Sequence, residues 1–261
     1  MEFSGWIIAN LVTIVIFFIT VGYYKGKVDT ITKDNGNFEL NSEGKLVING
    51  LEYTPATNRD GDVKFEDVWF AYNEPNWTLR GISFDLQKGQ SLAFVGPTGA
   101  GKTTMVKLLM RFYDVNSGSI RLDGNDIRNY NRRELRDAFG MVLQDTWLYN
   151  GTIKDNIAYG KEGASMDEIL RAAKAAHAHH FIKSLPGGYE MELNEEASNV
   201  SQGQKQLITI ARAILADNRV LILDEATSSV DTRTETRIQK AMDNLMKGRT
   251  SFIIAHRLST I

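Results

Sequence analysis

The stretch GPTGAGKTT combines residue types whose spacing predicts phosphate chemistry. Its glycines allow a tight turn that points successive backbone N–H groups inward, and Lys102 adds a mobile cation. The apolar run SLAFV precedes it and the amphipathic run MVKLLMRFY follows, so a strand should enter the turn and a helix dipole should face it. A glycine-rich turn with a surface lysine is the alternative. The match to G-x-x-x-x-G-K-[ST] favours a phosphate-binding loop, with a hydroxyl for Mg²⁺ on Thr103, made by Gly96, Pro97, Thr98, Gly99, Ala100, Gly101, Lys102, Thr103 and Thr104.

An acidic pair about 120 residues later could hold Mg²⁺ and orient the attacking water, which hydrolysis requires in addition to a phosphate-binding loop. Asp224 and Glu225 end the almost continuously apolar run RVLILDE, which is typical of a strand covered on both faces. Because parallel strands share the edge at which they end, the pair should lie near the phosphate loop. We predict that Asp224 helps to hold Mg²⁺ and that Glu225 is the general base. The alternative is a pair that only terminates a strand.

The elements that must position these residues alternate along the chain. From about Gly61, strand-like runs separate helices with apolar residues at i, i+3, i+4 and i+7. This order predicts an α/β fold with a mostly parallel sheet over residues 61–261. The expected strands are VKFEDVWFAY, SLAFVG, SIRLDG, GMVLQD, RVLILDE and TSFIIAH; the expected buried stripes are Met105, Leu108, Leu109 and Phe112; Leu207, Ile210, Ala211 and Ile214; and Ile238, Ala241, Met242 and Leu245.

The first sixty residues differ in kind from the rest. Residues 6–24 carry no charge and are nearly long enough to span a bilayer as a helix, and lysines follow at once. We therefore predict a membrane anchor over residues 1–27 with everything after it in the cytoplasm; a buried helix is the alternative. Residues 28–60 form a polar linker, in which Asn49-Gly50 predicts a two-residue β-hairpin turn.

Composition narrows the class of protein further. The chain has 261 residues, 43% of them hydrophobic, so it can bury a sizeable core. Its formal net charge of −2 does not favour a nucleic-acid partner, and we expect none. It contains no cysteine, which excludes disulfides and thiolate metal sites.

From about Val63 onward the chain resembles the nucleotide-binding domain of an ATP-binding cassette exporter. Besides the phosphate loop and the acidic pair, the resemblance rests on VLQD, NVSQGQKQ, LILDEATSSVD and IAHRLST, in that order. GTIKDNIAYG and SLPGGYE also resemble exporters more than importers. The resemblance implies a P-loop NTPase fold with a RecA-like core, a helical subdomain over about residues 152–215, and ATP with Mg²⁺ as ligands.

The resemblance also assigns individual roles. Tyr72 would stack on adenine, Gln144 would contact Mg²⁺ or the attacking water, and His256 would contact the γ-phosphate and position Glu225. Each has a plainer alternative: packing beside neighbouring aromatics, an exposed loop residue and a buried histidine. The signature residues Ser201, Gln202, Gly203 and Gln204 would contact the γ-phosphate of a nucleotide held by a second subunit. Asp231, the last residue of LILDEATSSVD, would also belong to the nucleotide site.

The signature also has a purely structural explanation. Ser201 and Gln204 have the spacing of a capping box at the start of a helix. Val200 and Gln202 depart from the commonest family form, which has leucine and glycine there. A second capping box, Ser165 with Glu168, predicts a helix over residues 165–182. We expect no metal at His177, His179 and His180 on this helix.

Taken together, the patterns predict an ATPase whose hydrolysis drives export, working as a homo- or heterodimer with a transmembrane domain at the cell membrane. About six membrane helices would precede such a domain and further strands and helices would follow it, so a truncated or rearranged chain is expected. Two other classes stay open: a non-transporting ATP-binding subunit or inactive fragment, and an importer-type or soluble cassette ATPase. The presence of Glu225 and His256 argues against a site that cannot hydrolyse ATP, because loss of either residue would be expected in such a site.

Overall fold

The computed structural model describes residues 38–40, 46–48, 51–52, 60–97, 99–143, 146–194, 197–225 and 231–255. The chain divides into two units, Met1–Thr54 and Pro55–Ile261. In the first, β1 (Phe38–Leu40), β2 (Leu46–Ile48) and β3 (Leu51–Glu52) form an antiparallel sheet. Ile48 pairs with Leu51, the register that a two-residue connection at Asn49-Gly50 produces.

The expected anchor over residues 1–27 lies outside the described residues. Within the part of the chain that is described, no helix combines the length and the hydrophobicity needed to cross a membrane.

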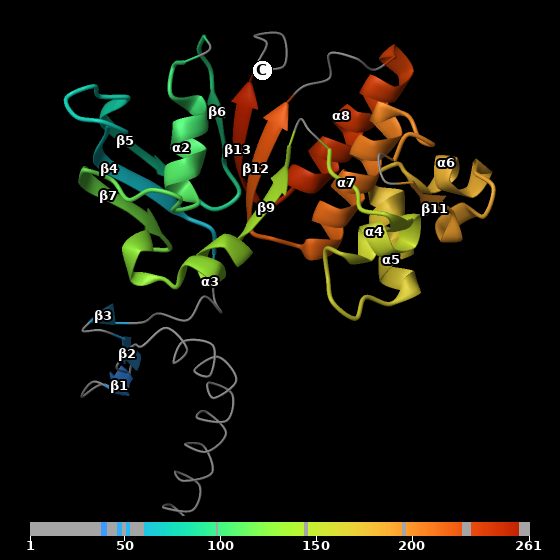
Figure 1. The fold of residues 1–261 in the computed structure, drawn as a ribbon, viewed down its shortest axis with the longest axis horizontal. Coiled ribbons are helices and arrows are strands. Elements are labelled where there is room, and N and C mark those ends of the chain that lie inside the picture. Colours follow the sequence, from blue (N-terminus) through green and yellow to red (C-terminus); the bar gives the residue numbers. More distant parts are fainter. Residues whose placement is uncertain are drawn as a thin grey trace, which may run out of the picture. The chain divides into compact units, whose positions relative to one another are not determined.

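A four-stranded parallel sheet forms the centre of the second unit (Figure 1). Its order is β6 (Ser91–Phe94), β13 (Thr250–Ala255), β12 (Val220–Glu225) and β9 (Phe139–Val142). Four of the predicted strands are these, so the α/β fold and the parallel sheet are confirmed.

A second, antiparallel sheet differs from the prediction, which placed all strands in one mostly parallel sheet. It has the order β5 (Leu79–Leu86), β4 (Val63–Phe70), β7 (Ser117–Leu122) and β8 (Asn125–Asp126). β4 alternates between buried and more exposed residues over most of its length, the pattern of a strand covered on one face. The backbones of β4 and β7 lie close together at Gly118 of β7, where a Cβ would be only 2.2 Å from the Asp67 carbonyl oxygen of β4.

Helices cover the parallel sheet on both faces and create two apolar clusters. On one face α2 (Lys102–Leu109), α3 (Arg132–Asp137) and the antiparallel sheet share a cluster. On the other, α4 (Ile153–Ala158), α5 (Met166–Ala175), α6 (His179–Ser184), α7 (Gln202–Ala216) and α8 (Thr232–Met246) share the second. Alternate β12 residues face opposite clusters, with Val220 and Ile222 in the first and Leu221 and Leu223 in the second.

Short elements complete the described fold. The 3₁₀ helix η3 (Ile127–Asn129) precedes α3, and η4 (Gly188–Glu190) follows α6. β10 (Gly151–Thr152) pairs antiparallel with β11 (Glu192–Leu193), which ties the start of α4 to the segment before α7.

The helix predicted over residues 165–182 is wrong as a single element, because the structure has α5 and α6 in its place. The capping box of Ser165 and Glu168 at its start is confirmed. α5 ends where His177 adopts a φ of +54°, while the N–H groups of His177 and Ala178 donate to Lys174 and Ala173. This is a Schellman ending, which usually carries glycine at the left-handed residue, so a histidine there does not indicate a helix end in advance.

The three predicted apolar stripes are buried except at two positions. Phe112 is 55% exposed because α2 already ends at Leu109, and Ile214 is only partly buried. The stripe on α8 is buried throughout, which fixes that helix against the second cluster.

Candidate functional site

The predicted phosphate loop connects the end of β6 directly to the start of α2. Gly101 is the N-cap residue of α2 and has a φ of +89°; a Cβ there would lie 2.9 Å from the Leu79 side chain, so only glycine fits without a shift. Lys102 reaches back over the loop, where its Nζ donates to the carbonyl oxygens of Gly96 at 2.6 Å and Pro97 at 3.1 Å. The loop thus gathers an ammonium group and the N-terminal N–H groups of a helix, an arrangement suited to a phosphate.

The members of the loop differ in exposure. Thr103 is exposed on the first turn of α2, whereas Thr104 is 6% exposed and Gly101 is buried. Gly96, Pro97, Gly99 and Ala100 form the turn itself, which the Ala100 N–H closes by donating to the Pro97 carbonyl at 3.1 Å. Thr98 lies outside the described residues.

Tyr72 is brought to the same helix from the end of β4. Its hydroxyl lies 3.2 Å from the Thr104 hydroxyl, and its ring is perpendicular to those of Phe70 and Tyr113, with centroids 4.9 and 5.1 Å away. The alternative of packing beside aromatic neighbours is therefore partly right. At 43% exposed, however, the ring also leaves surface on which a base could stack.

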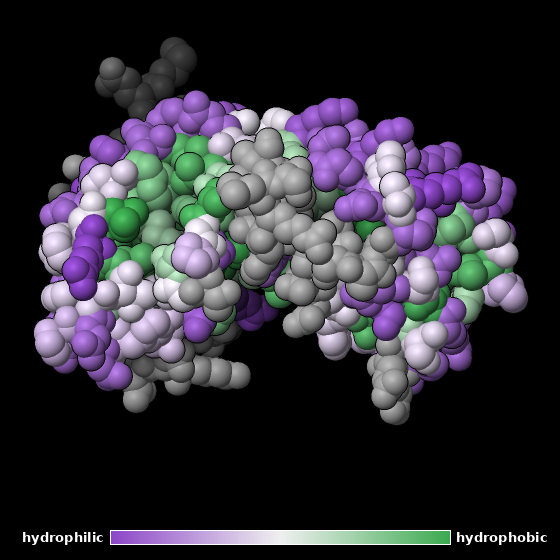
Figure 2. Space-filling model, turned by 90° about the horizontal axis from the view of Figure 1, so that it is seen from above, coloured by the Kyte–Doolittle hydropathy of each residue, from purple (hydrophilic) through white to green (hydrophobic). Residues whose placement is uncertain are grey.

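The acidic pair ends β12 at the level of the phosphate loop. Asp224 pairs in register with Ile254 of β13, and Ile254 pairs with Phe94, two residues before Gly96. Strands are roughly 4.8 Å apart, so Asp224 lies about 10 Å across the sheet from β6. Figure 2 views the molecule from above, toward the edge at which these strands end, where the more continuous hydrophobic areas lie on the half that holds the antiparallel sheet.

This placement bears on whether the residues could hold Mg²⁺. The exposed hydroxyl of Thr103 and the half-buried carboxylate of Asp224 are hard oxygen ligands, and both lie at the end of the parallel sheet where the phosphate loop begins. The donor set fits a magnesium ion that also binds phosphate oxygens. The described residues contain no group of three or more His, Asp or Glu side chains that could hold a metal by themselves.

The signature residues open α7. Ser201 and Gln204 form the predicted capping box, in which the Ser201 hydroxyl accepts from the Gln204 N–H at 3.3 Å and the Gln204 side chain accepts from the Ser201 N–H at 2.8 Å. Gln202 is exposed and donates from Nε2 to the Thr146 hydroxyl at 3.1 Å, which links α7 to the segment after Gln144. Gly203 is buried in the first turn.

Asp231 is explained by helix capping. Its side chain accepts from the Thr234 N–H at 3.0 Å at the start of α8, and the hydrogen bonds of Thr234 lower the pKa of the carboxyl group. Gln144, His256 and the side chain of Glu225 lie outside what the structure describes, so their roles stay predictions.

Sequence reasoning missed the polar centre that supports the helical half. Asn156 is fully buried: its Oδ1 accepts from the Tyr149 N–H at 3.1 Å and Arg212 Nη2 at 3.0 Å, and its Nδ2 donates to the carbonyls of Tyr149 at 3.0 Å and Thr152 at 3.1 Å. Arg212 also donates to the Asn156 carbonyl at 2.8 Å, and burial lowers the pKa of its guanidinium. No local pattern marks a buried asparagine in advance, because its partners come from two elements.

Arg212 also lies beneath a group of exposed rings. Its guanidinium is 5.8 Å from the Trp147 ring and 5.3 Å from the Tyr159 ring, and these rings with that of Tyr149 have centroids about 6 Å apart. Trp147 is 60% exposed and Tyr159 66%. We call Trp147, Tyr149 and Tyr159 the aromatic patch.

His177 and His179 have different surroundings. His177 ends α5, while Nδ1 of His179 lies 2.8 Å from the Tyr189 hydroxyl. Burial raises the pKa of Tyr189 to about 12.

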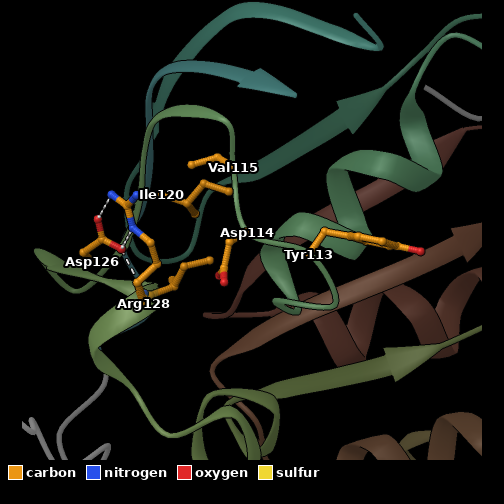
Figure 3. Close-up of a pocket in the computed structure, with 7 residues that line it drawn as sticks. Tyr113, Asp114, Val115, Ile120, Asp126 and Arg128 are labelled. Carbon is orange, nitrogen blue, oxygen red and sulfur yellow. Dashed lines mark hydrogen bonds and ion pairs between the residues drawn. The ribbon is translucent and has the colours of Figure 1, made fainter. Parts of the chain in front are cut away.

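A small hollow near α3 holds an ion pair (Figure 3). Arg128 Nη2 donates to Asp126 at 2.6 Å, and Asp126 also caps η3. Figure 3 shows the Tyr113 ring pointing away from this pair.

The strand, loop and helix around Lys102, together with the carboxylate of Asp224 on a parallel strand two places away in the sheet, define a domain of the P-loop NTPase class. Residues 79–228 match the family model described as "ABC transporter". This is more than half of the chain, which therefore belongs to the ABC transporter family and carries its ATP-binding domain.

Similar proteins of the family include, by name, an ATP-binding/permease protein, a flippase and an exporter. The chain is 58% identical over 204 residues to a fatty acid ABC transporter ATP-binding/permease protein of Mycobacterium bovis, covering 78% of this chain and 32% of that protein. It is 52% identical over 199 residues to an ATP-dependent lipid A-core flippase of Desulfotalea psychrophila, covering 76% and 35%. The solved structure of a bacterial Atm1-family ABC exporter with ATP bound is 46% identical, with a TM-score of 0.70 over 78% of this chain and 36% of that one. The chain thus spans about a third of the length of these relatives.

Proposed function

We propose that this chain binds and hydrolyses Mg·ATP and that the hydrolysis powers export of a substrate across a membrane. The observation that carries the proposal is Lys102, held over the turn between β6 and α2 by the carbonyls of Gly96 and Pro97. Entering phosphate oxygens would replace these carbonyls as acceptors while the N–H groups of α2 bind the same anion.

The remaining roles follow from position and from the family. Tyr72 offers an exposed ring to adenine, and Thr103 with Asp224 and Gln144 would hold Mg²⁺, which would neutralise charge on the β- and γ-phosphates. Glu225 would take the proton of the attacking water. His256, two residues beyond Ile254 of β13, would orient Glu225 and the γ-phosphate.

A second nucleotide-binding domain would complete the site. Ser201, Gln202, Gly203 and Gln204 open α7 with an N-terminus and a hydroxyl, both suited to a phosphate held by another subunit. The Ser201 oxygen accepts from Gln204, yet the hydroxyl hydrogen can still donate to an anion. ATP would then close a homo- or heterodimer, and hydrolysis would open it.

The aromatic patch supports coupling to a transmembrane domain. Exposed rings such as those of Trp147 and Tyr159 are a typical interaction surface, and Arg212 and Asn156 hold this one in place. Tyr159 and Arg212 also line a groove of about 500 Å³ beside β9 and α7. Helical segments of the membrane part would dock here. If Trp147→Ala leaves transport-coupled ATP turnover unchanged in a membrane complex, this docking role is wrong.

The proposed organisation keeps the expected boundaries: an anchor over residues 1–27, a linker over 28–60 and the ATP-binding domain over 61–261, with a helical subdomain over about 152–215. The domain would act on the cytoplasmic side of the cell membrane, with no nucleic-acid partner. The names of the relatives, which refer to fatty acids and lipid A, favour an amphiphilic substrate.

Mg²⁺-dependent ATP hydrolysis by the purified chain tests the central proposal. We expect turnover in the wild type, none without Mg²⁺, and ATP binding without turnover in Glu225→Gln. Binding of ATP by a folded dimer with no hydrolysis in either protein would favour the other class, a regulatory subunit that binds ATP without transport.

A further inference from the structure

The ring of Tyr72 packs against two other aromatic rings. Its neighbours Phe70 and Tyr113 lie 4.9 and 5.1 Å from it, and they are themselves only 5.7 Å apart. Their separation puts both rings in the same half of the space around Tyr72. Tyr72 is 43% exposed, so an open side of its ring remains available to solvent or a ligand.

The three rings differ in how firmly they are fixed. Phe70 is 3% exposed within the core, so it forms a rigid base. Tyr72 lies two residues beyond the end of β4, and besides the two rings its side chain contacts the Thr104 hydroxyl at its far end and the Lys107 ammonium, 5.6 Å from its centroid. Lys107 is a flexible cation that lies over the Tyr72 ring, so a base that stacks on the same face of the ring would displace it.

Tyr113 is anchored independently of Tyr72. The chain after α2 is braced by the Phe112 N–H, which donates to the Lys107 carbonyl at 2.8 Å. Arg111 pairs with Asp114 at 2.9 Å and donates to the Tyr130 carbonyl at 2.9 Å. The backbone on both sides of Tyr113 is therefore fixed, and its ring points away from the Asp126–Arg128 hollow (Figure 3).

We propose that Tyr113 is a positioning residue for base recognition: its ring holds Tyr72 perpendicular to itself and so presents the open side of Tyr72 to the base of the nucleotide. The inference rests on the proposed function, in which Tyr72 stacks on adenine. A perpendicular aromatic pair contributes a preferred geometry as well as packing. Without Tyr113, a ring that is nearly half exposed gains rotational freedom, and base binding must then restrict it again.

The test compares two ligands that differ in the base. Equilibrium binding of Mg·ATP and of inorganic tripolyphosphate is measured on the full chain for wild type, Tyr113→Leu, Tyr113→Phe and Tyr72→Leu. We expect Tyr113→Leu to weaken ATP binding about three- to tenfold and to leave tripolyphosphate binding unchanged. Tyr113→Phe keeps the ring and should bind both ligands as the wild type does.

The outcomes separate this inference from the proposed function. If Tyr113→Leu binds ATP like the wild type, or loses ATP and tripolyphosphate affinity equally, the positioning role is overturned while a loss in Tyr72→Leu would still support base stacking. If Tyr72→Leu keeps full ATP affinity, base stacking at Tyr72 is wrong and the inference fails with it. Absence of ATP binding in the wild type would overturn both.

Discussion

Replacing Asn156 by leucine tests whether the buried amide supports the helical half. The side chain is fully buried and takes part in four hydrogen bonds at 3.0 to 3.1 Å, one of them to the charged Arg212. Leucine has a similar volume, so the packing changes little, whereas the N–H of Tyr149 and the carbonyls of Tyr149 and Thr152 lose these bonds. Arg212 keeps the main-chain carbonyls of Asn156 and Trp147.

The expected loss follows from these bonds. A neutral hydrogen bond contributes about 1 kcal/mol net and one to a charged group about 2 kcal/mol, which gives about 3 to 5 kcal/mol for the set after allowing for non-additivity. Asn156→Asp keeps the acceptor for Tyr149 and Arg212 but points a carboxylate oxygen at the carbonyls of Tyr149 and Thr152, so a loss at least as large as that of Asn156→Leu is expected.

Urea unfolding followed by circular dichroism measures the free energies. Asn244→Leu is the matched control, because the half-buried Asn244 donates one hydrogen bond to the Ala175 carbonyl at 2.9 Å and accepts only an exposed one from Lys247, so this change should cost about 1 kcal/mol. If Asn156→Leu were no more destabilising than Asn244→Leu, the amide would not be the organising contact that its geometry indicates.

Three further outcomes are expected. Lys102→Met should weaken Mg·ATP binding at least about tenfold by calorimetry, because a charge-assisted phosphate contact is lost, and unchanged affinity would contradict the phosphate loop. His179, beside Tyr189, has its pKa lowered by burial and nearby cations, so its folded-state pKa lies below the unfolded value of about 6.5. The contribution of His179 to stability is present above about pH 6.5 and is lost as the pH falls through the folded-state pKa. Urea titrations should therefore show a smaller decrease in the free energy of unfolding in acid for His179→Gln than for the wild type, and equal decreases would refute this. Thr146→Val removes the exposed bond from Gln202 and should change the free energy of unfolding by under about 1 kcal/mol while altering the KM for ATP; an unchanged KM would make the bond incidental.

The parallel core could be predicted because its signals are local. RVLILDE and TSFIIAH are long apolar runs, and each forms a central strand of the sheet. The antiparallel sheet was missed because a half-buried strand such as β4 shows only alternation, which does not say which partner it pairs with. The break between α5 and α6 was missed because its left-handed residue is His177, where glycine would have been the signal.

The candidate site divides in the same way. Spacing alone located Lys102 and the Ser201 capping box, because each depends on neighbours within six residues. Tyr113 contacts Tyr72, and Asn156 contacts Arg212, between segments far apart in the chain, and one sequence without homologues does not reveal such contacts. Asp231 shows the limit of motif reasoning, since its observed partner is the start of its own helix.

β12 belongs to both apolar clusters, and this constrains how the domain can deform. Val220 and Ile222 pack on one side and Leu221 and Leu223 on the other, each at most 1% exposed. If the two apolar clusters rotated against each other, one packed face of β12 would have to separate from its cluster, because both clusters pack against this one strand. Asp224 should consequently keep its position relative to the phosphate loop even when helices farther from β12 move. The amides of β12 should exchange with deuterium only when the whole domain unfolds.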